Sequence, residues 1–501
     1  MGRYVSVNDC DIAVLGGGGA GLVAAVRAAE LSGGRVIVLE KANFTGGGML
    51  FASAMRTFRS KWQKERGLPD VMDEFIRKAM DDTYWRLDPR LVANTFRATG
   101  EFFDWFCGLE EGIADEFETG FYIFDGPEGP QVPLLKGSGE HHGAGKFIMD
   151  KMLERCAALG IEVLTGHRVS DMETENGKIT AVIAETEQGS VKVSCRAVIL
   201  ATGSWINNRE IIEKYFPKFA AVKMDPSAHM NPNYTGDGIA IAEKAGAYID
   251  YDSFVLRLMG PMCMCRSMCA MNMSNSPYSI SVNLDGRRFV CEPSQVRMGL
   301  FNSGLVTLDQ PEGRAFSVFA MPALERAAEE SRQPHEGYGG FFGWPQYPDS
   351  MDEILADLDL GVGESAVLRA DSIEELAEKM GVPADSFAET IAEYNANCDE
   401  GTDWGFHKPA EQLVKLDRGP YFAVKAALGT DGAFGGVLVD PDMQAYSAAG
   451  GLVEGFYAAG DLASGRHINL DGVKVQVIND MSWALASGFM AARSAAEYIK
   501  D

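Results

Sequence analysis

The sequence has no long apolar run and few basic residues, and each absence excludes a class of partner. No stretch approaches the roughly 20 consecutive apolar residues that a membrane-spanning helix needs. Lys and Arg number 45 against 71 Asp and Glu, for a net charge of −26. This balance argues against nucleic acid or an anionic membrane as the main partner. The first ten residues also lack the apolar segment of a signal peptide, so we expect a cytoplasmic protein.

Cysteine is scarce and unevenly placed. Nine Cys in 501 residues, an odd number, do not suggest a disulfide framework. Cys263, Cys265 and Cys269 lie close together in a Met-rich stretch, but they show neither the Cys-x-x-Cys pairs of zinc sites nor the usual iron–sulfur spacings. We therefore expect no metal, and interpret the stretch as an adaptable wall of a pocket or core.

A strand, a helix and a second strand are expected at the N-terminus. Residues 10–15 form an apolar run, residues 20–31 have helical spacing, and residues 35–39 form a β-branched strand that ends at Glu40. Together they make a βαβ unit.

The turn of this unit carries the motif G-x-G-x-x-G at Gly16, Gly18 and Gly21. Gly16 allows a tight turn, Gly18 lets the backbone approach a pyrophosphate, and Gly21 lets helix and strand pack closely. The helix N-terminus would face the phosphates, and Glu40 would accept hydrogen bonds from a ribose. The pattern therefore predicts a dinucleotide site.

The two ends of the chain look like one α/β domain with a different domain inserted between them. A strand leads to Ala201-Thr202-Gly203 and another to Gly460-Asp461, and a helix closes the chain. A simple NAD domain would finish within about 150 residues, so these later turns favour FAD. We expect an α/β fold, a Rossmann-like FAD-binding domain with an inserted α+β capping domain. The expected boundaries are 1–254 and 425–501 for the FAD-binding domain and 255–424 for the cap.

A series of motifs resembles the soluble FAD-binding branch of the fumarate reductase and succinate dehydrogenase flavoprotein superfamily. The motifs are DIAVLGGGGAGLVAA, VIVLEK, AVILATGSWINNREIIEKYFP, NYTGDGIAIAEKAGA, NLDGRRFVCE, IAEYNANCDEGTDWGFHK, GPYFAVKA and GFYAAGD. The resemblance implies a mobile cap, with the active site between cap and FAD domain. It also implies noncovalent FAD, because the loop 43–50 has no His where membrane-bound relatives attach the cofactor.

The resemblance further implies which residues contact FAD. Asp461 matches the acidic residue that usually binds the ribityl chain. Backbone amides near Gln476 and Val477 would face the pyrimidine edge and stabilise negative charge on reduced flavin. The full set of candidate cofactor residues is Gly16, Gly18, Gly19, Ala20, Gly21, Glu40, Lys41, Thr45, Gly46, Gly47, Val169, Ala201, Thr202, Gly203, Asp237, Gly460, Asp461, Gln476 and Val477.

The carboxylate clamp of fumarate reductases is changed in this sequence. Where soluble relatives have a His-rich run, this chain has Asp431 and Gly432, and Asp471 or Gly472 stands at the position of the clamp Arg. Two Asp beside a dicarboxylate would cost on the order of several kcal/mol at an intermediate dielectric. We therefore expect that fumarate is not the substrate.

The resemblance leaves five catalytic candidates, which are Arg297, His467, Tyr421, Asp431 and Gly432. Arg297 lies close to the place of the cap Arg that donates a proton, and its alternative is a surface or salt-bridging Arg. The stretch around Tyr421 is also similar to 3-ketosteroid dehydrogenases, but Tyr421 and Phe422 stand in reverse order, so a core aromatic is the alternative. His467 is either a proton donor, a substrate ligand or a structural His.

We predict an FAD-dependent oxidoreductase acting on CH–CH groups, which reduces a C=C bond conjugated to a carbonyl. Flavin N5 would deliver hydride and Arg297 the proton, and the Met, Phe and Tyr content of 254–278 favours an apolar or aromatic substrate. The alternatives are a ketosteroid-type dehydrogenase working in the desaturating direction and an FAD-containing electron-transfer module. The partners would be a small-molecule substrate and an external donor or acceptor of electrons, namely a flavin reductase, a redox protein or free reduced flavin.

Overall fold

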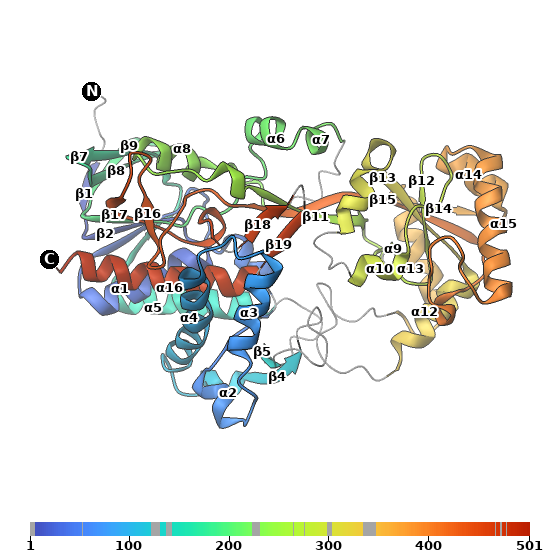
Figure 1. The fold of residues 1–501 in the computed structure, drawn as a ribbon, viewed down its shortest axis with the longest axis horizontal. Helices are drawn as coiled ribbons and strands as arrows, with labels where there is room; N and C mark the ends of the chain where they lie inside the picture. The colour runs from blue at the N-terminus through green and yellow to red at the C-terminus, as the bar shows by residue number, and fades with distance from the viewer. Residues whose placement is uncertain are drawn as a thin grey trace. The chain divides into compact units, whose positions relative to one another are not determined.

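A computed structural model describes residues 6–52, 54–121, 131–136, 143–222, 231–263, 265–274, 276–297, 303–333, 347–465, 467–470, 473–476 and 478–500. The chain divides into two compact units (Figure 1). Unit 1 comprises Met1–Ile211, Asn231–Leu256 and Gly432–Asp501, and unit 2 comprises Ile212–Met230 and Arg257–Asp431. Unit 2 thus takes in Ile212–Met230, which the sequence-based boundaries place in the FAD-binding domain. The domain limits 254/255 and 424/425 stay a prediction.

Unit 1 is built on a large sheet with parallel strands at its centre. Its order is β1–β9–β8–β17–β10–β2–β3–β6, with β16 paired to β17 and β7 to β8. The strands are β1 (Ser6–Asp9), β2 (Ile12–Leu15), β3 (Val36–Leu39), β6 (Glu162–Leu164), β7 (Arg168–Glu175), β8 (Lys178–Thr186), β9 (Gly189–Ser194), β10 (Ala197–Leu200), β16 (Gln444–Tyr446) and β17 (Leu452–Ala458). The strands β17, β10, β2, β3 and β6 pair in parallel.

The central strands explain why this sheet is parallel and covered. β2, β3 and β10 read IAVL, VIVL and AVIL, and every residue in them is buried. Continuous apolar strands are typical of parallel strands that are covered on both faces. The expected N-terminal βαβ unit is confirmed, with β2, α1 (Gly19–Ser32) and β3 in that order.

Three helices lie together below this sheet in the view of Figure 1. The helix α1 packs against both α5 (Ala144–Leu159) and α16 (Asp480–Tyr498). A Cβ at Gly488 of α16 would lie 2.3 Å from the carbonyl oxygen of Ala20, so a glycine is needed where α1 and α16 approach most closely. The helix α16 also packs on α4 (Pro89–Cys107).

Smaller elements complete unit 1. They are η1 (Gly47–Phe51), α2 (Lys61–Glu65), α3 (Met72–Asp82), η2 (Ile113–Glu116), β4 (Phe117–Phe121), β5 (Gln131–Leu135), α8 (Asp237–Lys244), η4 (Tyr251–Ser253), η7 (Gly460–Leu462), β18 (His467–Leu470) and β19 (Val473–Gln476). The helix α6 (Arg209–Tyr215) spans a boundary between the units.

Unit 2 contains a second sheet, in the order β11–β15–β13–β12 with β14 paired to β15. Its strands are β11 (Val255–Met262), β12 (Ile280–Asn283), β13 (Arg314–Ala320), β14 (Val367–Ala370) and β15 (Tyr421–Phe434). Its helices are α7 (Pro217–Ala220), α9 (Met268–Ser274), α10 (Glu292–Arg297), α11 (Ser303–Leu308), η5 (Pro311–Gly313), α12 (Met321–Ser331), α13 (Met351–Gly363), α14 (Ile373–Met380), α15 (Ala384–Glu400) and η6 (Ala410–Gln412).

Both faces of the second sheet are packed, because alternate residues of β13, β14 and β15 belong to different core clusters. Phe319 and Phe422 join a cluster with residues of α9, α12 and α13. Phe316 and Ala423 join a cluster with residues of α14 and α15. The Met- and Cys-rich stretch contributes Cys263, Cys269 and Met273 to the first cluster. These three side chains therefore lie in a core, which is one of the two interpretations that the sequence left open.

Together the two units make a mixed α/β protein, as predicted. Within the part of the chain that the structure describes, none of the helices combines the length and the hydropathy that crossing a membrane requires.

Candidate cofactor site and active-site residues

Two glycines of the motif are required by the protein itself. Gly16 has φ +111°, and a Cβ there would lie 2.3 Å from the carbonyl oxygen of Ala201. A Cβ at Gly21 would lie 1.9 Å from the carbonyl oxygen of Gly16. Both approaches are far below van der Waals contact, so any side chain at these positions would displace backbone. The turn between β2 and α1 therefore depends on Gly16 and Gly21 whether or not a ligand is bound.

Gly18 is different, because the protein leaves open space beside it. It caps the N-terminus of α1 with φ −84°, and the nearest atom to a Cβ there would be the carbonyl oxygen of Gly46, at 3.9 Å. The loop with Thr45, Gly46 and Gly47 runs alongside, since the Gly46 amide donates to the Gly17 carbonyl at 2.9 Å. The start of α1 thus keeps room where a pyrophosphate would approach a helix N-terminus.

Glu40 follows β3 and ties the glycine turn to the next strand. Its Oε2 accepts a hydrogen bond from the Gly17 amide at 2.7 Å, and its Oε1 accepts one from the Ala42 amide at 2.8 Å. Each carboxylate oxygen can accept more than one hydrogen bond. Glu40 is therefore fixed in place and still able to accept from ribose hydroxyls.

Lys41 and Arg168 share one carboxylate, that of Asp237 at the start of α8. The Arg168 guanidinium donates to both Asp237 oxygens, at 3.1 and 2.8 Å, and Lys41 Nζ donates to Thr235 Oγ1 at 2.6 Å and to Asp237 Oδ2 at 3.1 Å. Burial would raise the pKa of Asp237, but the Arg168 hydrogen bond and the Lys41 charge outweigh it and lower that pKa to about 2. The structure thus gives Asp237 an ion-pairing role that sequence reasoning missed. Val169, the neighbour of Arg168, is buried in β7.

The turn after β10 brings Ala201, Thr202 and Gly203 beside the glycine turn. The Ala201 amide donates to the Leu15 carbonyl at 2.8 Å, and Gly203 has φ +76°. The Thr202 hydroxyl is buried and has no hydrogen-bond partner among the described residues, and the same holds for Ser464, just after η7. Buried polar atoms of this kind are costly unless a ligand or water pairs with them.

The η7 turn is the last of the segments that form the candidate cofactor site. Its Gly460 amide donates to Ser487 Oγ at 2.9 Å, and its carbonyl accepts from Trp483 Nε1 at 2.7 Å, so α16 holds the turn. A Cβ at Gly460 would lie 3.2 Å from the Cβ of Ala20, which places Asp461 close to the start of α1. Segments from four distant parts of unit 1 therefore meet at the carboxyl ends of its parallel strands, where dinucleotides bind in such sheets.

The open space at Gly18 and the unpaired hydroxyls of Thr202 and Ser464 fit a bound FAD. Gly19 and Ala20 begin α1 directly after this space. Farther along, β18 and β19 form a hairpin in which His467 pairs with Gln476. The candidate substrate ligand His467 and the candidate flavin contact Gln476 thus lie opposite each other on one hairpin. Val477, Asp471 and Gly472 lie outside the described residues.

The structure places the remaining candidates on two elements, α10 and β15. Arg297 is the last residue of α10. Tyr421 begins β15, pairs with Ala320 and Ala370, and packs against the cluster of α14 and α15. Burial raises the pKa of Tyr421, which makes its hydroxyl a poorer proton donor. Asp431 and Gly432 lie in β15 where the chain returns from unit 2 to unit 1.

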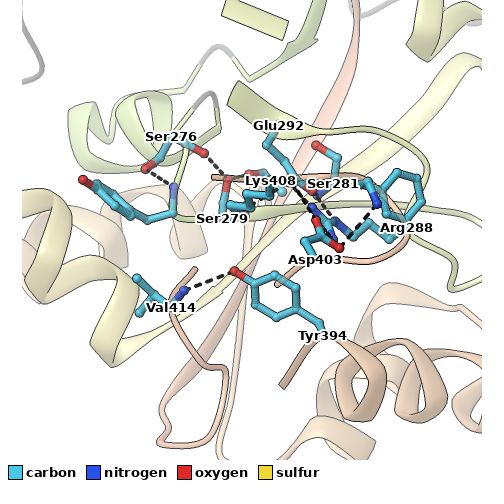
Figure 2. A network of polar contacts seen from close by, with 12 residues as sticks. Ser276, Ser279, Ser281, Arg288, Glu292, Tyr394, Asp403, Lys408 and Val414 are labelled. Atoms are coloured by element: carbon cyan, nitrogen blue, oxygen red, sulfur yellow. Dashed lines mark hydrogen bonds and ion pairs between the residues drawn. The ribbon is translucent and has the colours of Figure 1, made fainter. Parts of the chain in front are cut away.

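A buried ion network anchors the start of α10 (Figure 2). The Arg288 guanidinium bonds Glu292 through Nε at 2.9 Å and Nη2 at 2.7 Å, and its Nη1 lies 2.8 Å from Asp403 Oδ2. Lys408 Nζ lies 3.4 Å from Glu292 Oε2 and donates to the Ser279 carbonyl at 2.8 Å. The four side chains are at most 5% exposed, and two positive groups balance two negative ones.

Burial and ion pairing have opposite effects on the pKa values of the two basic groups in this network. Burial lowers the pKa of Lys408, against the attraction of Glu292. Burial also acts to lower the pKa of Arg288. The interactions of Arg288 with Glu292 and Asp403 are stronger than this effect, so its pKa is raised. Glu292 also accepts from the Ser281 amide at 2.9 Å, so the first residue of α10 is fixed to β12. The network therefore sets where α10 begins, five residues before Arg297. Sequence reasoning saw Arg288 and Glu292 only as part of a motif.

Comparisons with known proteins show the family and the fold of this chain. The family model of the FAD binding domain matches residues 11–470. A vinyl phenol reductase of Lactiplantibacillus plantarum is 27% identical over 97% of this chain and 96% of its own length. A 3-oxosteroid 1-dehydrogenase of Mycolicibacterium smegmatis is 25% identical over 92% of this chain and 93% of its own. The solved open conformation of a flavocytochrome c3 fumarate reductase superposes with a TM-score of 0.73, at 22% identity over 99% of this chain and 79% of its own, which shows a shared fold.

Proposed function

The chain belongs to the FAD binding domain family, and from that premise we propose that it is an FAD-dependent oxidoreductase that reduces a carbon–carbon double bond. FAD is its cofactor, and the likeness to fumarate reductases in sequence motifs and fold is confirmed. The residues gathered around the start of α1 are those that we propose bind the ADP half of FAD.

One observation carries the proposed reaction. The similarity to a vinyl phenol reductase runs from end to end, over 97% of this chain and 96% of that protein. The sequence around Asp431 argues against fumarate as the substrate, because an acidic residue replaces the His that would bind a dicarboxylate. We therefore propose an activated alkene other than fumarate as the substrate.

The negative charge that develops during hydride transfer limits which alkenes can react. Hydride adds to a C=C bond when the negative charge that develops can be delocalised, as it is into a conjugated carbonyl. A vinyl phenol can also accept a hydride after it loses its phenolic proton and gains a proton at its terminal carbon. The product of these two steps is a quinone methide, which is an alkene conjugated to a carbonyl. Enones, enoates and vinyl phenols are therefore one chemical class for this purpose.

When bound, FAD supplies the hydride from its N5 atom. The protein must then hold the alkene, exclude competing water and deliver a proton to the other carbon. We propose Arg297 as the proton donor and His467 as a residue that orients the carbonyl or phenol. Gly432 would polarise the same oxygen through its backbone amide. Tyr421 has a weaker case, because it packs against the core of unit 2.

The reducing electrons must come from a partner, for which we propose a flavin reductase, a redox protein or free reduced flavin. The similarity to a 3-oxosteroid 1-dehydrogenase supports a second candidate function, the desaturation of a ketone. The reversed order of Tyr421 and Phe422, relative to those enzymes, counts against it.

The role of Arg297 can be tested with a matched control. Arg297→Ala should retain FAD but lose turnover of its alkene by about 10²- to 10⁴-fold, the usual contribution of a positioned proton donor. Arg287→Ala removes an exposed Arg of the same unit, which pairs with Glu389 at 2.8 Å, and should change turnover by less than about twofold. Full activity of Arg297→Ala would remove this residue from the mechanism.

A further inference from the structure

Tyr234 contacts two separate segments of the candidate cofactor site in unit 1. A Cβ at Gly48 would lie 2.2 Å from the Tyr234 hydroxyl oxygen, and a Cβ at Gly203 would lie 3.4 Å from the ring carbon Cε1. The hydroxyl end of this side chain therefore lies against Gly48, and one edge of its ring lies against Gly203. Tyr234 thus bridges the loop that follows β3 and the turn that follows β10.

The strand order places this bridge across the glycine turn. The strands β10, β2 and β3 are neighbours in that order, and Leu15 pairs with both Leu200 and Leu39 at their carboxyl ends. The glycine turn after β2 therefore leaves the sheet between the turn after β10 and the loop after β3. Gly46 of that loop also forms a bridge with Gly18. A side chain that contacts both outer segments must therefore span the middle one, which carries the open space beside Gly18.

The backbone around Tyr234 is held from the same two sides. The Asn207 amide donates to the Tyr234 carbonyl at 2.8 Å, and Asn208 Nδ2 donates to the Thr235 carbonyl at 3.2 Å. Both asparagines follow the turn after β10. From the other side, Lys41 Nζ donates to Thr235 Oγ1 at 2.6 Å, and Lys41 follows β3. The half-buried side chain of Tyr234 is therefore fixed in place by its own backbone.

Gly48 provides the room for the Tyr234 hydroxyl. Among the described residues outside its own turn, only Tyr234 has atoms within 4 Å of a Cβ at Gly48, namely Oη at 2.2 Å and Cζ at 3.6 Å. Gly48 is also not one of the glycines with a positive φ. The position therefore excludes a side chain because of the hydroxyl, and not because of its backbone conformation.

A phenolic hydroxyl can donate one hydrogen bond, and hydrogen bonds to a charged phosphate oxygen are stronger than those between neutral groups. We propose that Tyr234 is a further residue of the FAD site, where its ring covers the pyrophosphate and its hydroxyl donates to a phosphate oxygen. This inference rests on the proposed place of the ADP half of FAD at the start of α1. It does not depend on the proposed reaction.

Titration of the full-length apoprotein with FAD tests the role of the hydroxyl. Tyr234→Phe removes one oxygen and should raise the Kd for FAD about 10- to 100-fold, the range expected for a hydrogen bond to a charged group. Tyr84→Phe removes the hydroxyl of an exposed tyrosine in the same unit, and should change the Kd by less than about twofold.

Gly18→Ala, measured in the same titration, distinguishes two ways in which the inference can fail. If Gly18→Ala weakens FAD binding and Tyr234→Phe does not, the role of Tyr234 is wrong and the place of the pyrophosphate stands. If neither variant weakens binding, the proposed place of the ADP half is wrong, and the role of Tyr234 is wrong with it.

Fragments of FAD identify the group that the hydroxyl contacts. ADP carries the pyrophosphate without the flavin, and riboflavin carries the flavin without a phosphate. In competition against FAD, Tyr234→Phe should weaken the binding of ADP by the same factor as that of FAD, and should leave the binding of riboflavin unchanged. Weaker binding of FAD and riboflavin, with unchanged binding of ADP, would place the hydroxyl at the flavin and overturn the proposal.

Gly48 offers an independent test of the contact. Gly48→Ala should raise the Kd for FAD in the wild type, because the new Cβ would displace the Tyr234 hydroxyl. In the Tyr234→Phe background the nearest remaining atom is Cζ, at an ordinary contact distance of 3.6 Å. There the same substitution should change the Kd by less than about twofold. An equal cost in both backgrounds would contradict the contact.

The wild-type chain gives a readout that needs no variant. Cleavage after Lys223 and Lys244 releases the peptide 224–244, in which Tyr234 is the only tyrosine. Mass spectrometry of this peptide follows nitration of Tyr234 by tetranitromethane. FAD or ADP, at about ten times its Kd, should slow this nitration about tenfold, because only about one tenth of the chains remain free. Equal nitration with and without FAD, or protection by riboflavin but not by ADP, would overturn the proposal.

Discussion

A substitution at Gly18 distinguishes an effect on FAD binding from an effect on the stability of the fold. An Ala at this position adopts φ −84° without strain, and its Cβ would meet no protein atom nearer than 3.9 Å. The role inferred for Gly18 is to let the backbone approach the pyrophosphate of FAD. Gly18→Ala should therefore weaken FAD binding while leaving the fold of the apoprotein intact.

The magnitude follows from two opposing terms. At a helix N-cap, replacing Gly by Ala costs up to about 1 kcal/mol. Ala also lowers the conformational entropy of the unfolded chain relative to Gly, which stabilises the folded protein by about 0.4 to 1 kcal/mol. The apoprotein should thus change in stability by less than about 1 kcal/mol. A methyl group forced into the occupied site should cost about 1 to 3 kcal/mol, which raises the Kd for FAD by about 5- to 150-fold.

The assay compares three glycine variants by FAD titration and by urea unfolding of the apoprotein. Gly18→Ala should change the Kd alone. Gly21→Ala should lower the stability of the apoprotein as well, because its Cβ would lie 1.9 Å from the Gly16 carbonyl oxygen. Gly108→Ala, whose Cβ would make ordinary contacts at 3.4 Å, should change neither. If Gly18→Ala binds FAD as the wild type does, the pyrophosphate does not lie against the start of α1.

Two further predictions concern buried charges. Lys408→Met should lower the free energy of unfolding by about 3 to 5 kcal/mol, because it leaves the network of Arg288, Glu292 and Asp403 with an unbalanced negative charge. Lys415→Met, which removes an ion pair with Asp399 near the surface, should cost less than about 1 kcal/mol in the same urea titration, and equal losses would contradict a tightly coupled network. The pKa of Asp237 is lowered from 3.8 to about 2, so its ionisation stabilises the fold above pH 4 by up to about 2 kcal/mol, and this stabilisation is lost as the pH falls through about 2. The stability difference between wild type and Asp237→Asn should shrink over that range, and a constant difference would contradict the ion pairing.

The local patterns of the cofactor half were readable from the sequence. Gly16, Gly18, Gly21 and Glu40 lie within one βαβ unit, and its strands, helix and turn follow from periodicity and glycine spacing over about thirty residues. The α/β class was predicted for the same reason and is confirmed. The turn at Gly460-Asp461 was interpreted from the sequence as a nucleotide contact, but the role of Asp461 at the ribityl chain was assigned only through the resemblance to a family.

The buried contacts of unit 2 were not readable. Arg288 and Asp403 are brought together by the sheet and by α15, and no local pattern links them. The Met-rich stretch around Cys263 was interpreted as the wall of a pocket or a core, and its side chains Cys263, Cys269 and Met273 lie in a core. Composition alone cannot separate a pocket wall from a core, because both require apolar side chains.

The central claim is that this FAD-dependent protein reduces an alkene, and one anaerobic experiment tests it most directly. The flavin of the purified protein would be reduced chemically and then mixed separately with an enone, an enoate and a vinyl phenol, while its long-wavelength absorbance band is followed. The account predicts rapid return of the oxidised flavin band with one of these compounds and formation of its saturated product. Failure of all three, together with bleaching of the oxidised flavin by a saturated ketone, would contradict the account and establish the dehydrogenase direction.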